Sequence, residues 1–243
     1  MVTRDMHPMT QVAITNLNKT LQEAQLNEMS SLVIVDNSSA EPLRHQTLAS
    51  AVPFHVVRLD RRHSFSSASN WGAKKLKGAD FLLFLNNDVF LHPYALKYML
   101  EDTKLFSASI CGARLVYPNQ QIQHVGVGFK VGGEPYHLHH YENSRQISRV
   151  ISPLPAVTGA VMLIDSDLFW ALNGFDPRFP FAYEDTDFCL RAGATGATII
   201  CSQRVESIHL SGQTRDHETR KFEKLSRDIF MARWRGRVGP ILA

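Results

Sequence analysis

The sequence predicts an α/β fold, a mostly parallel β-sheet with helices on both faces. Four short apolar runs, at residues 12–15, 32–35, 54–59 and 81–85, have the continuous hydrophobicity of strands buried on both sides. Helical patterns lie between them at residues 19–29 and 66–77. Alternation of strand and helix along a chain is typical of parallel sheets.

The second half of the chain continues this pattern less regularly. We expect helices over residues 93–105, 165–172 and 184–192, and strands over residues 110–116, 157–164 and 198–201. Residues 118–152 are rich in Gly, His, Asn, Gln and Tyr, and predict a long excursion with one hairpin at Gly132-Gly133. Such long irregular segments are often binding loops. An amphipathic helix is expected over residues 216–235.

Length and composition indicate one globular domain over residues 1–243, because 44% of the residues are hydrophobic, 20% are charged and no linker or repeat appears. No apolar run approaches the ~20 residues of a membrane helix, and the first residues lack a secretory signal. Three cysteines in apolar segments predict reduced, buried thiols. We therefore expect a cytoplasmic protein.

The net charge of +3 is unevenly distributed. From Arg215 onward, eight basic and four acidic residues give +4, which leaves −1 for the first 214 residues. The basic excess belongs to the last segment alone, so nucleic-acid binding by the whole domain is not expected.

Two predicted strands end in an acid, Asp36 in LVIVDNSS and Asp88 in FLLFLNNDV. Ligands of open α/β sheets bind beyond the carboxyl ends of the strands. Asp88 could hold a divalent cation beneath a nucleotide diphosphate, and Asp36 could hydrogen-bond a base. The alternative is that both acids are turn or helix-capping residues.

A second acidic group, Glu184, Asp185 and Asp187, begins a predicted helix in FAYEDTDFCLRAG. The helix dipole alone would explain at least one of these acids. Glu184 or Asp185, next to the aromatic stretch before the helix, could also act as a general base. Asp187 is better placed to cap the helix or to pair with Arg191 one turn later.

Six stretches follow one another in a characteristic order. They are IVDNSS (34–39), FSSASNWGAKKLKGADFLLFLNNDV (65–89), GARLVYPNQQIQHVGVGF (112–129), VTGAVMLIDSDLFWALNGFDPRF (157–179), YEDTDFCLRAGATGATII (183–200) and VESIHLSGQTR (205–215). In order and spacing they resemble family 2 glycosyltransferases, which have the Rossmann-like GT-A fold, and within them the bacterial rhamnosyltransferase-like branch.

The resemblance implies transfer of a sugar from a UDP- or dTDP-sugar to a hydroxyl of a glycan acceptor, with inversion at the anomeric carbon. Asp36 would bind the uracil or thymine ring, and Asn70 would lie near the nucleotide. Asn86, Asn87 and Asp88 take the place of the family's D-x-D motif. The nucleotide-binding half would span about residues 10–110, and the acceptor and catalytic half would span about residues 111–215.

The resemblance also implies a divalent cofactor, Mn2+ or Mg2+, bound by Asp88 and by His209 in ESIHLSG. Because this motif keeps only its last acid, the cation gains one charged ligand there, and an imidazole ligand favours Mn2+. Asp185 would be the catalytic base, with Glu184 as the second candidate. The acceptor would be a growing surface polysaccharide or a lipid-linked glycan.

Two other features allow more than one interpretation. His137, His139 and His140 could form a metal cluster, contact the acceptor, or lie in a solvated loop. Trp234 and the arginines around it on the last helix could contact the inner face of a membrane. The alternative for that helix is ordinary packing with a solvated basic face.

Two other functions compete with glycosyl transfer. A non-catalytic, glycosyltransferase-like binding protein would explain the missing acid in NND and the curtailed first strand and helix. A nucleotidyltransferase would share the sheet and the metal, but it would need a Gly-rich loop after the first strand, and TNLNKT contains no glycine.

Overall fold

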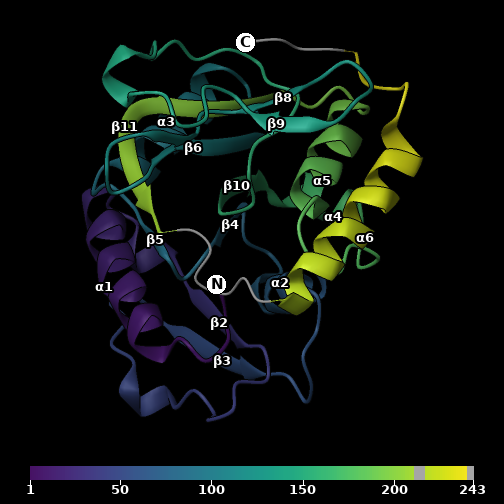
Figure 1. Cartoon of the computed structure of the whole chain (residues 1–243). Helices are drawn as coiled ribbons and strands as arrows, with labels where there is room; N and C mark the ends of the chain where they lie inside the picture. Colours follow the sequence, from purple (N-terminus) through teal and green to yellow (C-terminus); the bar gives the residue numbers. More distant parts are fainter. Residues whose placement is uncertain (211–216, 240–243) are drawn as a thin grey trace.

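The computed structural model of the chain describes residues 1–210 and 217–239. Two β-sheets run through the middle of the molecule, with α1 on one side and α4, α5 and α6 on the other (Figure 1). The α-helices are α1 (His7–Glu23), α2 (Phe65–Ala73), α3 (Ala95–Leu105), α4 (Ser166–Ala171), α5 (Glu184–Gly193) and α6 (His217–Trp234). Short 3-10 turns lie at Asn27–Met29, His45–Thr47, Lys74–Leu76 and Ser144–Gln146.

The first sheet is parallel and has the order β1-β2-β3. Its strands are β1 (Val2–Thr3), β2 (Leu32–Asp36) and β3 (Phe54–Arg58). Helix α2 packs on β2 so closely that a Cβ atom on Gly72 would lie 2.9 Å from the Val35 side chain. A residue without a Cβ is therefore required where this helix crosses the sheet.

The second sheet is mixed, in the order β4-β10-β6-β11-β5, with β7 on β6. Its strands are β4 (Phe81–Leu85), β5 (Val89–Phe90), β6 (Ile110–Val116), β7 (Ile122–His124), β10 (Val161–Asp165) and β11 (Ile199–His209). Strand β10 runs antiparallel to both β4 and β6, while β6 and β11 are parallel, so β4, β6 and β11 share one direction. The predicted α/β class is confirmed.

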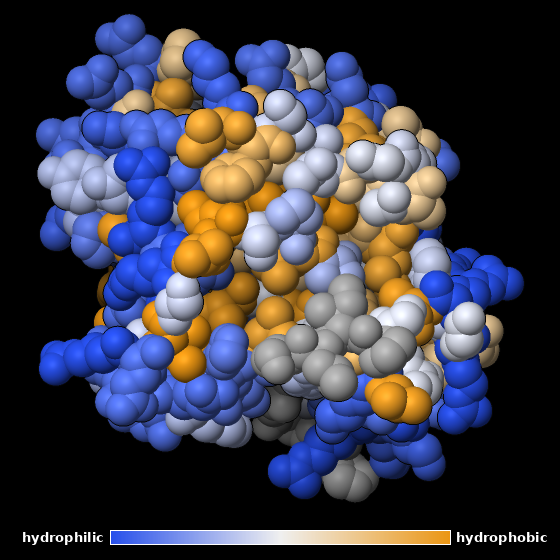
Figure 2. All heavy atoms as spheres, turned by 90° about the horizontal axis from the view of Figure 1, so that it is seen from above, coloured by the Kyte–Doolittle hydropathy of each residue, from blue (hydrophilic) through white to orange (hydrophobic). Residues whose placement is uncertain are grey.

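Two apolar clusters hold the sheets and helices together. One joins α1, β2 and α3 to the second sheet. The other contains phenylalanines that meet at tilted or edge-on angles, Phe84, Phe169, Phe175 and Phe188. Seen from above, hydrophobic residues gather in the middle of the surface and hydrophilic ones at its edge (Figure 2).

The prediction of a first strand over residues 12–15 is wrong, because these residues lie inside α1. Val12 is 53% exposed, whereas Ala13, Ile14, Leu17 and Leu21 are buried at helical spacing. The predicted helix over 19–29 is only the end of α1 and the short turn after it.

The other predicted elements are found, those over 81–85 and 110–116 with the predicted ends and the rest with shifted ends. The strands predicted over 32–35, 54–59, 81–85 and 110–116 are β2, β3, β4 and β6, and the hairpin at Gly132-Gly133 joins β8 (Val127–Phe129) to β9 (Pro135–His137). The strand predicted over 198–201 continues to His209, and this extension brings the end of β11 alongside β5. Among the described residues, no helix combines the length and hydropathy needed to cross a bilayer.

Candidate active site

A cavity of about 520 Å³ lies where several carboxyl ends of strands meet. The ends of β1 and β4, the turn before β10, the start of α5 and the end of β11 all contribute to its wall. Six of the predicted site residues line it, namely Asn86, Asn87, Asp88, Glu184, Asp185 and His209. The fold therefore brings together residues that are more than a hundred positions apart.

Asp88 and His209 meet because β5 pairs with the extended β11, which puts Val89 opposite His209. The Nε2 atom of His209 lies 3.1 Å from Oδ1 of Asp88, and its Nδ1 atom lies 2.5 Å from Oε1 of Gln123. The Leu210 amide also donates to the Asp88 carbonyl at 3.0 Å. These contacts fix the carboxylate and the imidazole at one point of the cavity wall.

The two asparagines before Asp88 have different surroundings. The Asn87 amide donates to the hydroxyls of Thr3 and Thr10 at 3.0 and 3.1 Å, so it holds the turn against β1 and α1. The Asn86 side chain has a buried Oδ1 atom with no hydrogen-bond partner among the described residues. Asn87 is thus a structural anchor, while Asn86 presents an unpaired acceptor.

The start of α5 is unusual in its backbone. Ala182 and Tyr183 both have positive φ angles, 62° and 70°, which cost about 1–3 kcal/mol each for residues with side chains. The Asp185 carboxylate that follows accepts hydrogen bonds from the amides of Gly159 and Thr186, each at 2.7 Å. The strained turn therefore ends in a carboxylate held in one orientation.

Glu184 differs from its neighbour. It is 5% exposed, and its Oε2 atom has no partner among the described residues. Burial, and then the nearby charge of Asp185, raise the pKa of Glu184 to about 8. Glu184 is therefore largely protonated at neutral pH and can donate a hydrogen bond.

A second cavity of about 450 Å³ adjoins the first. Both are lined by Thr158, Ala182, Asp185 and His209, whereas Glu184 lines only the first. Tyr117 and Tyr141 line the second cavity and were missed by sequence reasoning, although the tyrosines and histidines crowded into residues 117–141 were a signal. Asp185 thus stands where the two cavities meet.

Two of the residues predicted to bind or lie near the nucleotide, Asp36 and Asn70, do not line the first cavity. Asp36 is fully buried, and its carboxylate accepts from the Ser39 and Leu43 amides, both at 2.9 Å, and from Arg58 at 2.7 Å. These donors lower the pKa of Asp36 against the opposing effect of its burial. Asn70 exchanges two hydrogen bonds with the backbone of Phe175, at 2.7 and 3.0 Å. Both side chains hold the scaffold.

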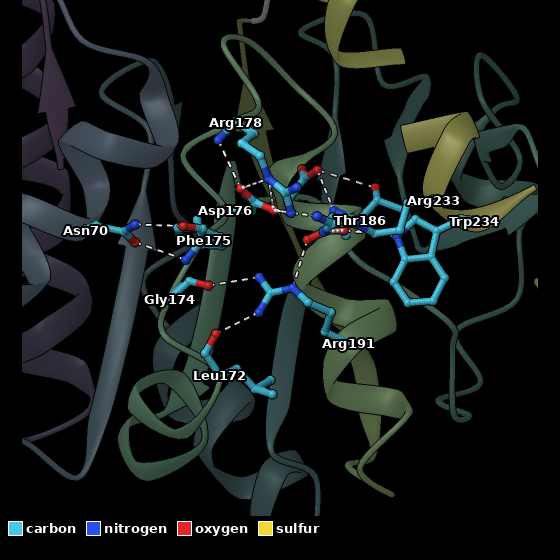
Figure 3. Close-up of polar contacts among 12 residues, drawn as sticks. Asn70, Leu172, Gly174, Phe175, Asp176, Arg178, Thr186, Arg191, Arg233 and Trp234 are labelled. Atoms are coloured by element: carbon cyan, nitrogen blue, oxygen red, sulfur yellow. Dashed lines mark hydrogen bonds and ion pairs between the residues drawn. The ribbon is translucent and has the colours of Figure 1, made fainter. Parts of the chain in front are cut away.

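The acid Asp187 pairs with Arg191 one turn later, as predicted, at 2.8 Å. Its other oxygen accepts from Arg233 and from the Trp234 indole of α6, and Arg233 also reaches Asp176 at 2.6 Å (Figure 3). Trp234 and Arg233 are therefore engaged in packing α6 onto α5, which is the alternative given above for the last helix.

The donor set of the first cavity fits a divalent cation that binds together with a ligand. Asp88 and His209 offer one carboxylate and one imidazole, and Asn86 offers an unpaired amide oxygen. Among the described residues no three His, Cys, Asp or Glu side chains form a group able to hold a metal. Oxygens of a diphosphate would complete such a coordination sphere.

The same finding bears on the histidine-rich loop. A metal cluster of His137, His139 and His140 is not formed. His137 and His140 line the second cavity, and His139 instead lies 3.1 Å from Glu142.

Comparison with solved structures places the fold among GT-A glycosyltransferases. The chain superposes on the mannosyltransferase PcManGT from Pyrobaculum calidifontis, solved with GDP-Man and Mn2+, with a TM-score of 0.67 and 14% identity over 99% of this chain and 64% of that one. It also superposes on GalNAc-T7, solved with UDP, GalNAc and Mn2+, with a TM-score of 0.58 and 14% identity over 76% of this chain and 38% of that one. The protein is thus a GT-A glycosyltransferase in fold.

The sequence comparisons give the family. The profile of Glycosyl transferase family 2 matches residues 16–172, so the chain belongs to that family. It is 28% identical to the O-antigen biosynthesis protein RfbC of Myxococcus xanthus over 193 residues. This aligned region covers 76% of this chain and 15% of RfbC. It is 23% identical over 194 residues to the low-salt glycan biosynthesis hexosyltransferase Agl10 of Haloferax volcanii, over 76% of this chain and 61% of Agl10.

Proposed function

We propose that the protein transfers a sugar from a UDP- or dTDP-sugar to a hydroxyl of a glycan, with inversion, in the manner of the rhamnosyltransferase-like branch. The observation that carries this proposal is the meeting of two cavities at one oriented carboxylate, Asp185. One cavity suits the donor and the other suits the acceptor, and transfer requires the two substrates to meet beside a base.

Unpaired polar atoms support a donor in the first cavity. Asn86 Oδ1 and Glu184 Oε2 are buried without a hydrogen-bond partner among the described residues, and both residues line this cavity. Buried polar groups are almost always paired in folded proteins, so these atoms point to a bound ligand. Arg4, whose Nε atom lies 3.6 Å from the Asp5 carboxylate, adds a positive charge to the same wall. Arg62 adds a second positive charge to the wall, which suits a diphosphate.

Mn2+, or less favourably Mg2+, would be held by Asp88 and His209 together with the diphosphate. When bound, the cation would stabilise the charge that grows on the leaving diphosphate. Both solved neighbours were determined with Mn2+, which supports this proposal.

In the proposed reaction, the acceptor oxygen attacks the anomeric carbon from the face opposite the diphosphate. The new carbon–oxygen bond forms as the bond to the diphosphate breaks, and Asp185 takes the hydroxyl proton. The two amide hydrogen bonds to Asp185 keep its carboxylate in place for this step. Glu184, which is protonated, can donate a hydrogen bond to a hydroxyl of the donor sugar.

We also propose a cellular location and a biosynthetic role for the protein. The three cysteines are free and buried, which supports a reducing cytoplasmic compartment. The relation to RfbC supports a role in surface polysaccharide synthesis. Exposed arginines near the end of α6, Arg235 and Arg237, are the groups that remain for a peripheral membrane contact.

The test is calorimetric titration of the protein with UDP, dTDP, GDP and CDP, with and without Mn2+. Binding of UDP or dTDP that requires Mn2+ and is lost in Asp88→Ala is the expected result. Binding that survives this substitution unchanged would remove Asp88 from the site. Nucleotide binding without transfer or donor hydrolysis would indicate a non-catalytic relative, and pyrophosphate release from a nucleoside triphosphate would indicate a nucleotidyltransferase.

A further inference from the structure

We propose that the second cavity binds an uncharged sugar ring of the acceptor, stacked on the aromatic face of Tyr141. The inference rests on the proposed transferase function and adds the chemical class of the acceptor. It combines the aromatic cluster at the cavity with the charges of its wall.

The cluster offers an exposed aromatic surface beside polar atoms. Tyr141 is 59% exposed, and its ring lies parallel to that of Tyr117, at 5.4 Å and 9°, and against that of His140 at 3.9 Å. The Tyr117 hydroxyl lies 3.0 Å from His140 Nε2, which holds the rings together. A sugar ring has an apolar C–H face that can cover an aromatic ring, and hydroxyls at its edge that need polar partners.

The backbone presents Tyr141 in a fixed position. His139 and Tyr141 have positive φ angles of 54° and 68°. The loop is nevertheless tied down, because the Tyr141 amide donates to the Ile122 carbonyl at 2.8 Å and the Leu138 amide to the Gly126 carbonyl at 3.0 Å. Backbone strain that is retained in this way is common at ligand sites. A large exposed ring is thus held rigidly at the mouth of a cavity.

The charges of the wall exclude an anionic acceptor. The charged side chains in the described lining of the second cavity are acidic, Asp185 and Glu223, and no lysine or arginine is among them. Burial lowers the pKa of His124 well below its usual value, with His137 adding to the effect, and burial also lowers the pKa of His140. These two histidines are therefore uncharged at neutral pH.

The two cavities differ in this respect. Arg4 and Arg62 line the first cavity, where an anionic diphosphate needs cations. An acceptor with a phosphate or carboxylate in the second cavity would find no lysine or arginine on the described wall and would face two acids. Charge therefore assigns the anionic donor to the first cavity and the uncharged sugar to the second.

The experiment is saturation-transfer NMR on the full chain with the methyl glycosides of glucose, galactose, rhamnose and N-acetylglucosamine, and with methyl glucuronide as the anionic probe. At least one neutral glycoside should bind, and the glucuronide should not. Tyr141→Ala should weaken that binding about tenfold, while Tyr141→Phe, which keeps the ring, should retain it. Tyr94→Ala, at a tyrosine that is 41% exposed outside both cavities, is the matched control and should bind like the wild type.

Preferred binding of the glucuronide, or equal binding by Tyr141→Ala and the wild type, would overturn the inference. Nucleotide calorimetry on the same samples separates it from the proposed function. Nucleotide binding without any binding of neutral glycosides overturns the acceptor inference and leaves the transferase intact. Glycoside binding that depends on Tyr141, in a protein that binds no nucleotide, supports the sugar site and removes the transferase function.

Discussion

At the scale of single residues, the adjacent acids Glu184 and Asp185 have different environments. Substitutions at the two positions should therefore have different effects on activity. Asp185 borders both cavities with its carboxylate oriented by two amides, whereas Glu184 borders one and carries a proton. Asp185→Asn should keep nucleotide affinity and lower turnover by about 10² to 10⁴-fold, because it cannot accept a proton. Single-turnover kinetics and calorimetry would measure the two effects separately. A larger loss of turnover in Glu184→Gln than in Asp185→Asn would make Glu184 the base.

Glu184 also predicts a pH dependence of stability. Its pKa of about 8 lies above the 4.5 of an exposed glutamate, so the folded state binds more protons than the unfolded state between these values. The contribution of Glu184 to stability is present below about pH 4.5 and is lost as the pH rises to about 8. In urea unfolding, Glu184→Gln should gain stability relative to the wild type across this range. A difference between the two proteins that stays constant with pH would contradict the assignment.

The sequence alone could not separate the cavity residues from the structural ones, because strand register decides what lies beside each acid. Asp36 and Asp88 both stand at strand ends, and nothing local distinguishes them. Register places Arg58 opposite Asp36, where it occupies the carboxylate, and His209 opposite Val89, beside Asp88. The resemblance identified His209, but only the paired strands show that Asp36 is shielded.

At the scale of elements, the ion pairs that hold α6 against α5 can be tested by substitution. Arg233 is 21% exposed and joins α6 to Asp187 and Asp176, and Thr219 and Phe222 on the same helix line the first cavity. Arg233→Ala should lower the free energy of unfolding by about 2–3 kcal/mol, because it leaves a fully buried carboxylate with fewer partners.

A matched control is available in the same cluster. Arg178 also binds Asp176, but its side chain is 68% exposed, so Arg178→Ala should cost less than about 1 kcal/mol. Chemical denaturation of both variants would give the two values. Equal losses of unfolding free energy in the two variants would mean that the pairs between Arg233 and the acids do not hold α6 in place.

The misplaced first strand shows the limit of periodicity over short windows. The run at residues 12–15 is too short to separate a strand from one turn of a buried helix. The longer spacing of Ala13, Leu17 and Leu21 and the proline at the start of α1 were the stronger signals. By contrast β6, whose seven residues are all buried, was predicted with its observed ends.

At the scale of the whole molecule, the proposed metal site would be formed by the protein and its bound nucleotide together. The described residues provide too few ligands for a cation to bind strongly alone. Mn2+ should therefore bind weakly to the protein by itself and much more tightly when UDP or dTDP is present, as expected when diphosphate oxygens complete the coordination sphere. Electron paramagnetic resonance of free Mn2+ would measure both affinities. Equally tight binding in the absence of nucleotide would contradict a shared site.

The unpaired buried atoms of Asn86 and Glu184 have a consequence for the lifetime of the protein in the cell. Each buried polar group without a partner costs about 1–3 kcal/mol, and a ligand that supplies partners recovers part of that cost while binding only the folded state. The chain should therefore resist proteolysis longer when its donor is abundant. Starvation for the proposed nucleotide-sugar donor would then shorten the half-life of the protein as well as slow the proposed reaction, so that the supply of one metabolite would set both the rate and the amount of catalyst.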